Sequence, residues 1–190
     1  REAWNILNAI AEGKIESGDE KKLNALKGET MAVIALCQFD LTRCFGYPYT
    51  KDKGASLGAP LIDHLVGTYE NPPRSTVAQA YDFIIETLEE AVTLMSEEKN
   101  NGRMNKYAAR ALLARIYLYH DDNRKAFDLA DQLIKDADTS GSYALYPHEK
   151  YVAAWSVEAK FGSESFFEIA NSVDDTPGRD SWGYLLNWYG

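Results

Sequence analysis

The sequence predicts a mainly α-helical protein built from antiparallel, tetratricopeptide-like (TPR-like) helical hairpins, followed by a less regular C-terminal segment. Apolar residues recur at steps of three and four over much of residues 1–138, which is the spacing of one helix face. Only Asp121, Asp122 and Asn123 separate two helical stretches, and so short a connection makes its helices antiparallel neighbours. Beyond residue 139 the spacing becomes irregular.

Two regions are therefore expected in the 190 residues. Residues 1–138 form a TPR-like helical scaffold that includes a long loop at 46–74. Residues 139–190 form an irregular segment with a short strand near 165–170, where Ser-Phe-Phe-Glu-Ile-Ala is rich in strand-forming side chains. The chain starts mid-pattern at an arginine, so we interpret it as a piece of a longer protein whose ligand-bearing part begins in 139–190.

The first two expected helices cover residues 1–11 and 19–45. The second is apolar nearly all round from residue 31 to 41, so we expect neighbours on several sides. Cys37 and Cys44 are expected to be small buried hydrophobic side chains. Their Cα atoms would lie roughly 10 Å apart along one helix, which is too far for a disulfide.

Three further helices are expected after the long loop. Thr76-Val-Ala-Gln79 reads as a capping box that starts a helix running to about residue 95. The next helix covers 105–120, and the last follows Asp122 as its expected cap. Its predicted buried stripe contains Ala126, Phe127, Ala130, Leu133, Ile134 and Ala137. A small residue nine positions after Tyr117 matches part of the TPR pattern.

Composition excludes several functions. The net charge is −9, with 20 basic and 29 acidic residues, which argues against nucleic acid as a partner because phosphate binding needs a basic surface. The sequence contains no run of 18 apolar residues, so we expect no membrane-spanning helix. Neither a His-Glu-x-x-His nor a Cys-x-x-Cys pattern occurs, so we expect no metal site and no cofactor.

Catalytic motifs are weak. Gly54-Ala-Ser-Leu-Gly58 matches the nucleophile motif of serine hydrolases, but that motif needs a preceding strand and a following helix. Here it lies in the long loop, so we expect Ser56 not to be a nucleophile and the protein not to be an enzyme. An α-helical glycosidase is a third alternative, which requires two carboxyl groups about 5 to 9 Å apart in one cleft.

Aromatic side chains in irregular segments are the candidate ligand contacts. Flat rings stack on the apolar faces of sugars and bury area at a low entropic cost. The candidate ligand-binding residues are Trp155, Trp182 and Trp188. Tyr47, Tyr49 and Tyr69 also lie outside the expected helices, and rings of this kind can equally pack on the helices as core.

Four stretches together resemble one family. They are Ala35–Gly46 followed by Tyr47-Pro48, Gly58-Ala-Pro-Leu61, Pro73–Ala91 with its Arg-Ser-Thr-Val-Ala-Gln start, and Asn105–Tyr119 with Asp121-Asp122. Their order resembles that of the SusD/RagB outer-membrane nutrient-binding lipoproteins of Bacteroidetes. Residues 163–170 also resemble a segment of that family. The resemblance implies a TPR-like scaffold and a lipid anchor at the cell surface, although this chain shows no signal or lipid-attachment cysteine.

The resemblance implies non-catalytic binding of an oligosaccharide or other nutrient, and its hand-over to a SusC-like TonB-dependent outer-membrane transporter. The alternative is a TPR-like scaffold that binds a protein segment. Rings gathered in loops on one rim would favour a glycan, whereas polar side chains lining a concave helical groove would favour a peptide.

Overall fold

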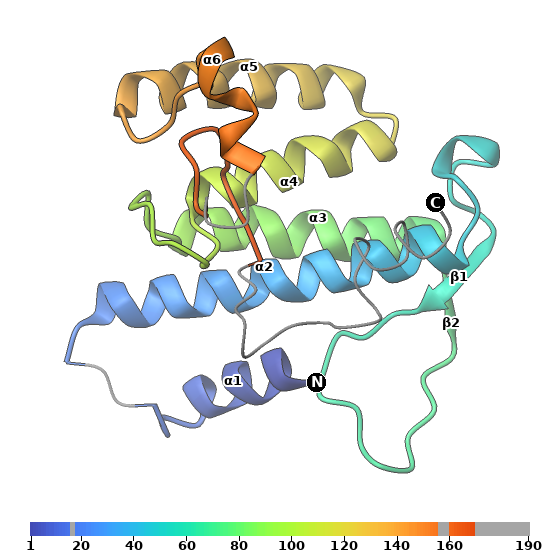
Figure 1. The fold of residues 1–190 in the computed structure, drawn as a ribbon. Coiled ribbons are helices and arrows are strands. Elements are labelled where there is room, and N and C mark those ends of the chain that lie inside the picture. Colours follow the sequence, from blue (N-terminus) through green and yellow to red (C-terminus); the bar gives the residue numbers. More distant parts are fainter. Residues whose placement is uncertain (16–17, 156–159, 170–190) are drawn as a thin grey trace, which may run out of the picture.

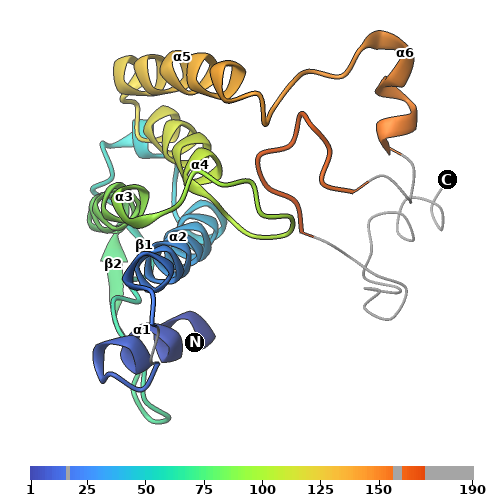
Figure 2. The ribbon, with the colours of Figure 1, turned by 90° about the vertical axis from the view of Figure 1, so that its left-hand side faces the viewer.

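The computed structural model describes residues 1–15, 18–155 and 160–169. Five long helices follow one another: α1 (Glu2–Ala11), α2 (Glu20–Phe45), α3 (Val77–Leu94), α4 (Lys106–Tyr119) and α5 (Asn123–Ser140). They stack in chain order, α1 to α5, as a layered array (Figures 1 and 2). The expected mainly α, TPR-like fold is confirmed. No helix in the described ranges has the length and apolar character needed to cross a membrane.

The shorter elements are a pair of strands, β1 (Leu57–Pro60) and β2 (Arg74–Thr76), a four-residue helix α6 (His148–Tyr151), and two 3-10 turns, η1 (Tyr49–Lys51) and η2 (Ala153–Trp155). The strands correct the expectation of a wholly irregular 46–74 loop. They pair antiparallel, with Leu57 opposite Thr76 and Pro60 opposite Arg74. This short pair returns the chain from the end of α2 to the start of α3, and only residues 61–73 form an open loop, called here the 61–73 loop.

The core lies on both sides of α3, which packs between α2 and α4. Its Ala80, Ile84, Leu88 and Ala91 are fully buried. Phe39 of α2 and Ile116 of α4 are also fully buried, and together with Ile84, Leu88 and Ala91 they belong to one apolar cluster. The recurrence of these positions at steps of three and four is what the sequence pattern predicts for a helix covered on two sides.

Side-chain caps start three of the helices. Asp19 accepts from Lys21 N–H and Lys22 N–H at α2, and Asn105 accepts from Ala108 N–H at α4. At α3 the predicted Thr76–Gln79 capping box is confirmed in both directions. Asp122 does precede α5, but its side chain makes no cap bond, because its carboxylate instead lies 3.0 Å from Nδ1 of His120.

Two burial predictions are wrong. Cys37 and Cys44 are exposed, and with Leu41 and Phe45 they form an uncovered apolar stripe along α2. On α5 only Ala126, Leu133 and Ala137 of the predicted stripe are buried, whereas Phe127 and Ile134 are 64% and 67% exposed. Among the described elements, α5 packs mainly against α4, so the buried stripe of α5 is narrower than its apolar stripe.

The expected strand near 165–170 is absent over its described residues, 165–169. Instead of joining a ladder, Phe166 places its ring 4.7 Å from that of Tyr143 and 6.3 Å from that of Tyr107, centroid to centroid. The Phe161 and Gly162 N–H groups donate to the Glu168 carboxylate. Side-chain packing on the start of α4 therefore replaces strand pairing, and the segment lies beside that helix (Figure 2).

Candidate functional site

The tryptophans predicted as ligand contacts are not brought together by the described structure. Trp155 closes the 3-10 turn η2, but its side chain lies outside the part of the chain that the structure describes. Trp182 and Trp188 also lie outside the described residues. These three residues therefore remain predictions, and the candidate site in the described ranges is found elsewhere.

Among the loop aromatics, the structure separates packed rings from free ones. The Tyr49 ring lies 5.6 Å from that of Tyr81 and 4.2 Å from that of His120, so it belongs to the core. Tyr69, by contrast, is 95% exposed in the 61–73 loop, which hangs from the strand pair toward the side of α1 (Figure 1). An exposed ring on a loop is a surface available for stacking.

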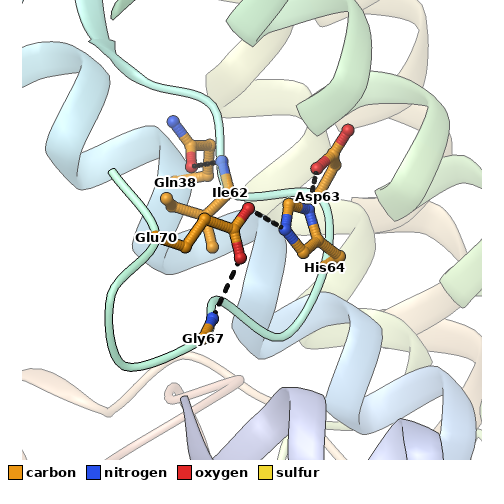
Figure 3. A network of polar contacts seen from close by, with 6 residues as sticks. All are labelled: Gln38, Ile62, Asp63, His64, Gly67 and Glu70. Carbon is orange, nitrogen blue, oxygen red and sulfur yellow. Dashed lines mark hydrogen bonds and ion pairs between the residues drawn. The ribbon is translucent and has the colours of Figure 1, made fainter. Parts of the chain in front are cut away.

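The loop is anchored at its root by a buried amide. Gln38 of α2 is only 2% exposed. Its Nε2 donates to the Pro60 carbonyl at 3.1 Å. Its Oε1 accepts from the Ile62 N–H at 3.2 Å (Figure 3). Both polar ends of the amide are thus satisfied by the backbone that leaves β1, and this fixes where the loop begins.

Further along, a histidine bridges two carboxylates. Nδ1 of His64 lies 2.6 Å from Oδ1 of Asp63, and Nε2 lies 2.6 Å from Oε1 of Glu70 (Figure 3). The other oxygen of Glu70 accepts from the Gly67 N–H at 3.0 Å. Contacts to Asp63 and Glu70 raise the pKa of His64, while the Gly67 N–H and His64 hold the pKa of Glu70 below its usual value.

A groove of about 640 Å³ lies between this loop and α3. Charged and titratable side chains line it from both walls: Asp63, His64, Glu70, Arg74, Asp82 and Glu86. Carboxylates accept hydrogen bonds from hydroxyl groups, and Tyr69 supplies an exposed ring on the same loop. The groove can therefore hold a polar ligand rich in hydroxyl groups.

The protonation of Glu70 bears on the glycosidase alternative. A glycosidase needs one carboxyl group with a raised pKa, which donates a proton to the leaving group. The pKa of Glu70 is instead lowered, so this side chain stays ionised and can only accept. Both nitrogens of His64 are occupied by carboxylates, and in the described part of the chain no group of three His, Cys, Asp or Glu side chains is arranged to hold a metal ion.

A second groove, of about 680 Å³, lies between the first half of α2 and the connection from α3 to α4. The Glu29 carboxylate organises one side of it. Nε of Arg103 donates to Glu29 at 2.9 Å, and the Met104 N–H donates to it at 3.1 Å. These bonds pin the α3–α4 connection onto α2, and we interpret them as structural.

Comparison with known proteins now defines the family. A SusD-like family model, described as starch-binding and associating with the outer membrane, matches residues 1–118. The chain belongs to the SusD-like family. Among solved structures, this SusD-like chain is similar to a SusD superfamily protein from Bacteroides thetaiotaomicron, with 40% identity, a TM-score of 0.84, and 91% of this chain matched to 37% of that one.

A second relative is a protein from Bacteroides vulgatus whose description proposes sugar binding. It is 39% identical with a TM-score of 0.86, and 97% of this chain matches 42% of that one. A SusD-like carbohydrate-binding protein from the same species, 23% identical with a TM-score of 0.76, shares the fold. The SusD-like chain thus spans about two fifths of the length of the first two of these relatives. None of the curated proteins matches it.

The bridge of His64 is the feature of the candidate site that sequence reasoning missed. The sequence does contain a signal: adjacent Asp63 and His64, followed by Gly67 and by Glu70 six positions after the histidine. That spacing allows the loop to fold back onto its own histidine, but many loops contain such residues without closing. Whether this loop closes depends on the strand pair, because the pairing of β1 with β2 sets the two ends of the loop side by side.

Proposed function

We propose that this SusD-like chain serves the non-catalytic binding of an oligosaccharide nutrient at the outer surface of the cell. The observation that supports this most is the family match over residues 1–118, together with two relatives at about 40% identity, one of them described as sugar binding. The proposal extends to location at the outer membrane and to hand-over of the glycan to a SusC-like TonB-dependent transporter.

We place the ligand contacts in two regions. Residues 139–190 begin the ligand-bearing part, with Trp155, Trp182 and Trp188 as stacking rings. The groove beside the 61–73 loop, with the exposed ring of Tyr69, is a further contact surface. Each stacked ring adds on the order of 1 kcal/mol beyond its buried area, while association itself costs about 4 kcal/mol or more.

The test is a glycan array on the complete gene product, followed by calorimetry with the best glycan on that product and on residues 1–190. Since binding is spread over several loops, losing two of them can move a micromolar site past millimolar. We expect the complete product to bind, and residues 1–190 to bind weakly or not at all. Absence of any bound oligosaccharide on the complete product contradicts the proposal.

Alanine substitutions locate the contacts. In the complete product, Trp155→Ala, Trp182→Ala, Trp188→Ala and Tyr69→Ala should each weaken binding by about fivefold if each ring contributes roughly 1 kcal/mol. Trp4→Ala in α1 is the matched control and should leave affinity unchanged. Hand-over is tested separately, by asking whether the tagged protein co-purifies with a TonB-dependent transporter from outer membranes.

A further inference from the structure

The geometry of the His64 bridge requires both ring nitrogens of His64 to be protonated. Both ring nitrogens lie 2.6 Å from carboxylate oxygens, one of Asp63 and one of Glu70 (Figure 3). An ionised carboxylate only accepts hydrogen bonds, and a neutral imidazole carries one N–H and one lone pair. Only the imidazolium donates to both partners at once. In the neutral ring, one nitrogen lone pair would face a carboxylate oxygen.

The bridge closes a defined stretch of backbone. Glu70 accepts from His64 with one oxygen and from the Gly67 N–H with the other. The Glu70 N–H also donates to the Gly67 carbonyl at 3.3 Å. The outgoing arm of the loop is therefore tied to its returning arm through one ring, and Tyr69 lies inside the closed stretch.

The root of the loop is fixed by different chemistry. The buried amide of Gln38 holds Pro60 and Ile62 to α2, and an amide does not titrate. Arg74, at the other end of the loop, donates from Nε and from Nη2 to the carbonyls of Gly58 and Leu57. One end of the loop is thus held to α2 and the other end to β1 whatever the charge of His64, and only the tip depends on that charge.

We propose that Asp63, His64 and Glu70 form a pH-operated clasp, which closes the tip of the 61–73 loop when the His64 ring is doubly protonated and releases it when the ring loses a proton. Release frees the segment that carries Tyr69 and so changes one wall of the groove against α3. The clasp does not depend on the proposed glycan function, because it concerns the loop alone.

The direction of the clasp's pH dependence follows from the direction in which the pKa of His64 is shifted. Hydrogen bonds to Asp63 and then to Glu70 raise the pKa of His64 above its usual value of about 6.5. Because the pKa of His64 is raised in the folded chain, the clasp contributes its full stability at pH values below the pKa of His64 in the unfolded chain. That contribution is lost as the pH rises through the pKa of His64 in the folded chain. Glu70, whose pKa is lowered first by the Gly67 N–H and then by His64, stays ionised across that range.

Other charges face the same groove. Asp82 and Glu86 of α3 line its opposite wall and add negative potential, which favours the imidazolium. Arg74 opposes them, although its guanidinium is engaged by the two backbone carbonyls of β1. Ser75 and Gln79, the other polar side chains that line the groove, carry no charge. The net environment is acidic and supports closure at low pH.

Two measurements on residues 1–190 test the clasp. NMR titration of the ring protons should give His64 a pKa above about 6.5, and Glu70→Gln should lower it. Exchange of the Gly67 amide, normalised to the intrinsic rate at each pH, should become about threefold faster at pH 8.5 than at pH 5.5, an effect of the size expected for exposed ion pairs.

Substitutions of two histidines show whether the pH dependence comes from His64. His64→Gln should abolish the normalised pH dependence at Gly67, while His148→Gln, at an exposed histidine in α6, should preserve it. A His64 pKa at or below the usual value that Glu70→Gln does not move would overturn the clasp. So would a Gly67 exchange ratio that is the same in the wild-type chain and in His64→Gln. The NMR titration of His64 in the wild-type chain tests the clasp even if a variant misfolds.

Discussion

At the scale of single residues, substitution of Leu113 measures how much the packing of the core contributes to stability. Leu113 lies in the middle of α4 with 5% of its surface exposed and belongs to the main apolar cluster. Leu113→Ala should lower the free energy of unfolding by roughly 2 to 5 kcal/mol, because the removed methyl groups leave a cavity. Leu118→Ala, 57% exposed on the same helix, should change it by less than about 0.5 kcal/mol. Equal losses from the two variants in denaturant melts would contradict this assignment.

Ser56 should not react as a nucleophile. Its hydroxyl donates to the Asp52 carboxylate, and the described contacts of Ser56 bring no imidazole to take its proton. The backbone around it serves the fold, since the Val77 N–H donates to its carbonyl at 2.9 Å. A fluorophosphonate probe followed by mass spectrometry should leave Ser56 unmodified, and stoichiometric labelling there would reverse the non-enzymatic interpretation.

Residue-level prediction succeeds where the partners are close in sequence. The capping box is an example, because Thr76 and Gln79 face each other in any helix that starts there. Gln38 shows the opposite case. Nothing local distinguishes it from a surface glutamine of α2, and it is buried only because β1 returns to it from 22 residues away.

At the scale of elements, the approach of α2 and α3 depends on Gly28. A Cβ at this position would lie 2.7 Å from Cγ of Met95 and 2.8 Å from the carbonyl oxygen of Ala91. The methionine can move, but the backbone carbonyl can do so only if the helices separate. Gly28→Ala should therefore cost about 1 to 3 kcal/mol through overpacking, which outweighs a gain in helix propensity of up to about 1 kcal/mol.

The matched control for this contact is Gly18→Ala. A Cβ at Gly18 meets no atom within 4 Å, so its stability should change by less than about 0.5 kcal/mol. Thermal or urea unfolding of both variants measures the difference. If Gly28→Ala were as stable as the unchanged chain, the two helices would have to pack less closely than described here.

Helices were the predictable elements, because α2 to α5 carry long apolar periodicities with recognisable starts. The strands were not. Pro60 and the short runs around it give little strand signal, and the β1–β2 pair lies where the chain returns from the end of α2 to the start of α3. Conversely, Phe166 and Phe167 look like strand residues, yet both pack against the helical core. Short apolar runs do not reveal whether their partner is a strand or a helix face.

At the scale of the whole molecule, stability should be graded across the layers. α3 is packed on two sides, and Ile84 and Leu88 at its centre are fully buried. α1 has no buried residue. We expect amides of α1 to exchange with solvent at least about tenfold faster than those of central α3, since a peripheral helix opens without disturbing the core. Residue-resolved hydrogen exchange measures this, and equal protection would mean that α1 opens only in global unfolding.

The layered array also explains how far the candidate site could be predicted. The family resemblance indicated a glycan-binding protein, and the residue pattern indicated a long loop at 46–74, but the position of the groove depends on the packing of α3 against that loop. The charges of Asp82 and Glu86 look like an ordinary solvated helix face until the loop stands opposite them. Binding surfaces assembled from distant segments are visible only after the layers are in place.

The unequal lengths of the connections carry a consequence for folding order. α4 and α5 are joined by residues 120–122, whereas α2 and α3 are joined by residues 46–76. Closing the longer connection costs more chain entropy, and contacts close in sequence form sooner. In refolding, the α4–α5 hairpin should therefore assemble first and present the inner face of α4 as a template, onto which α3 and then α2 condense.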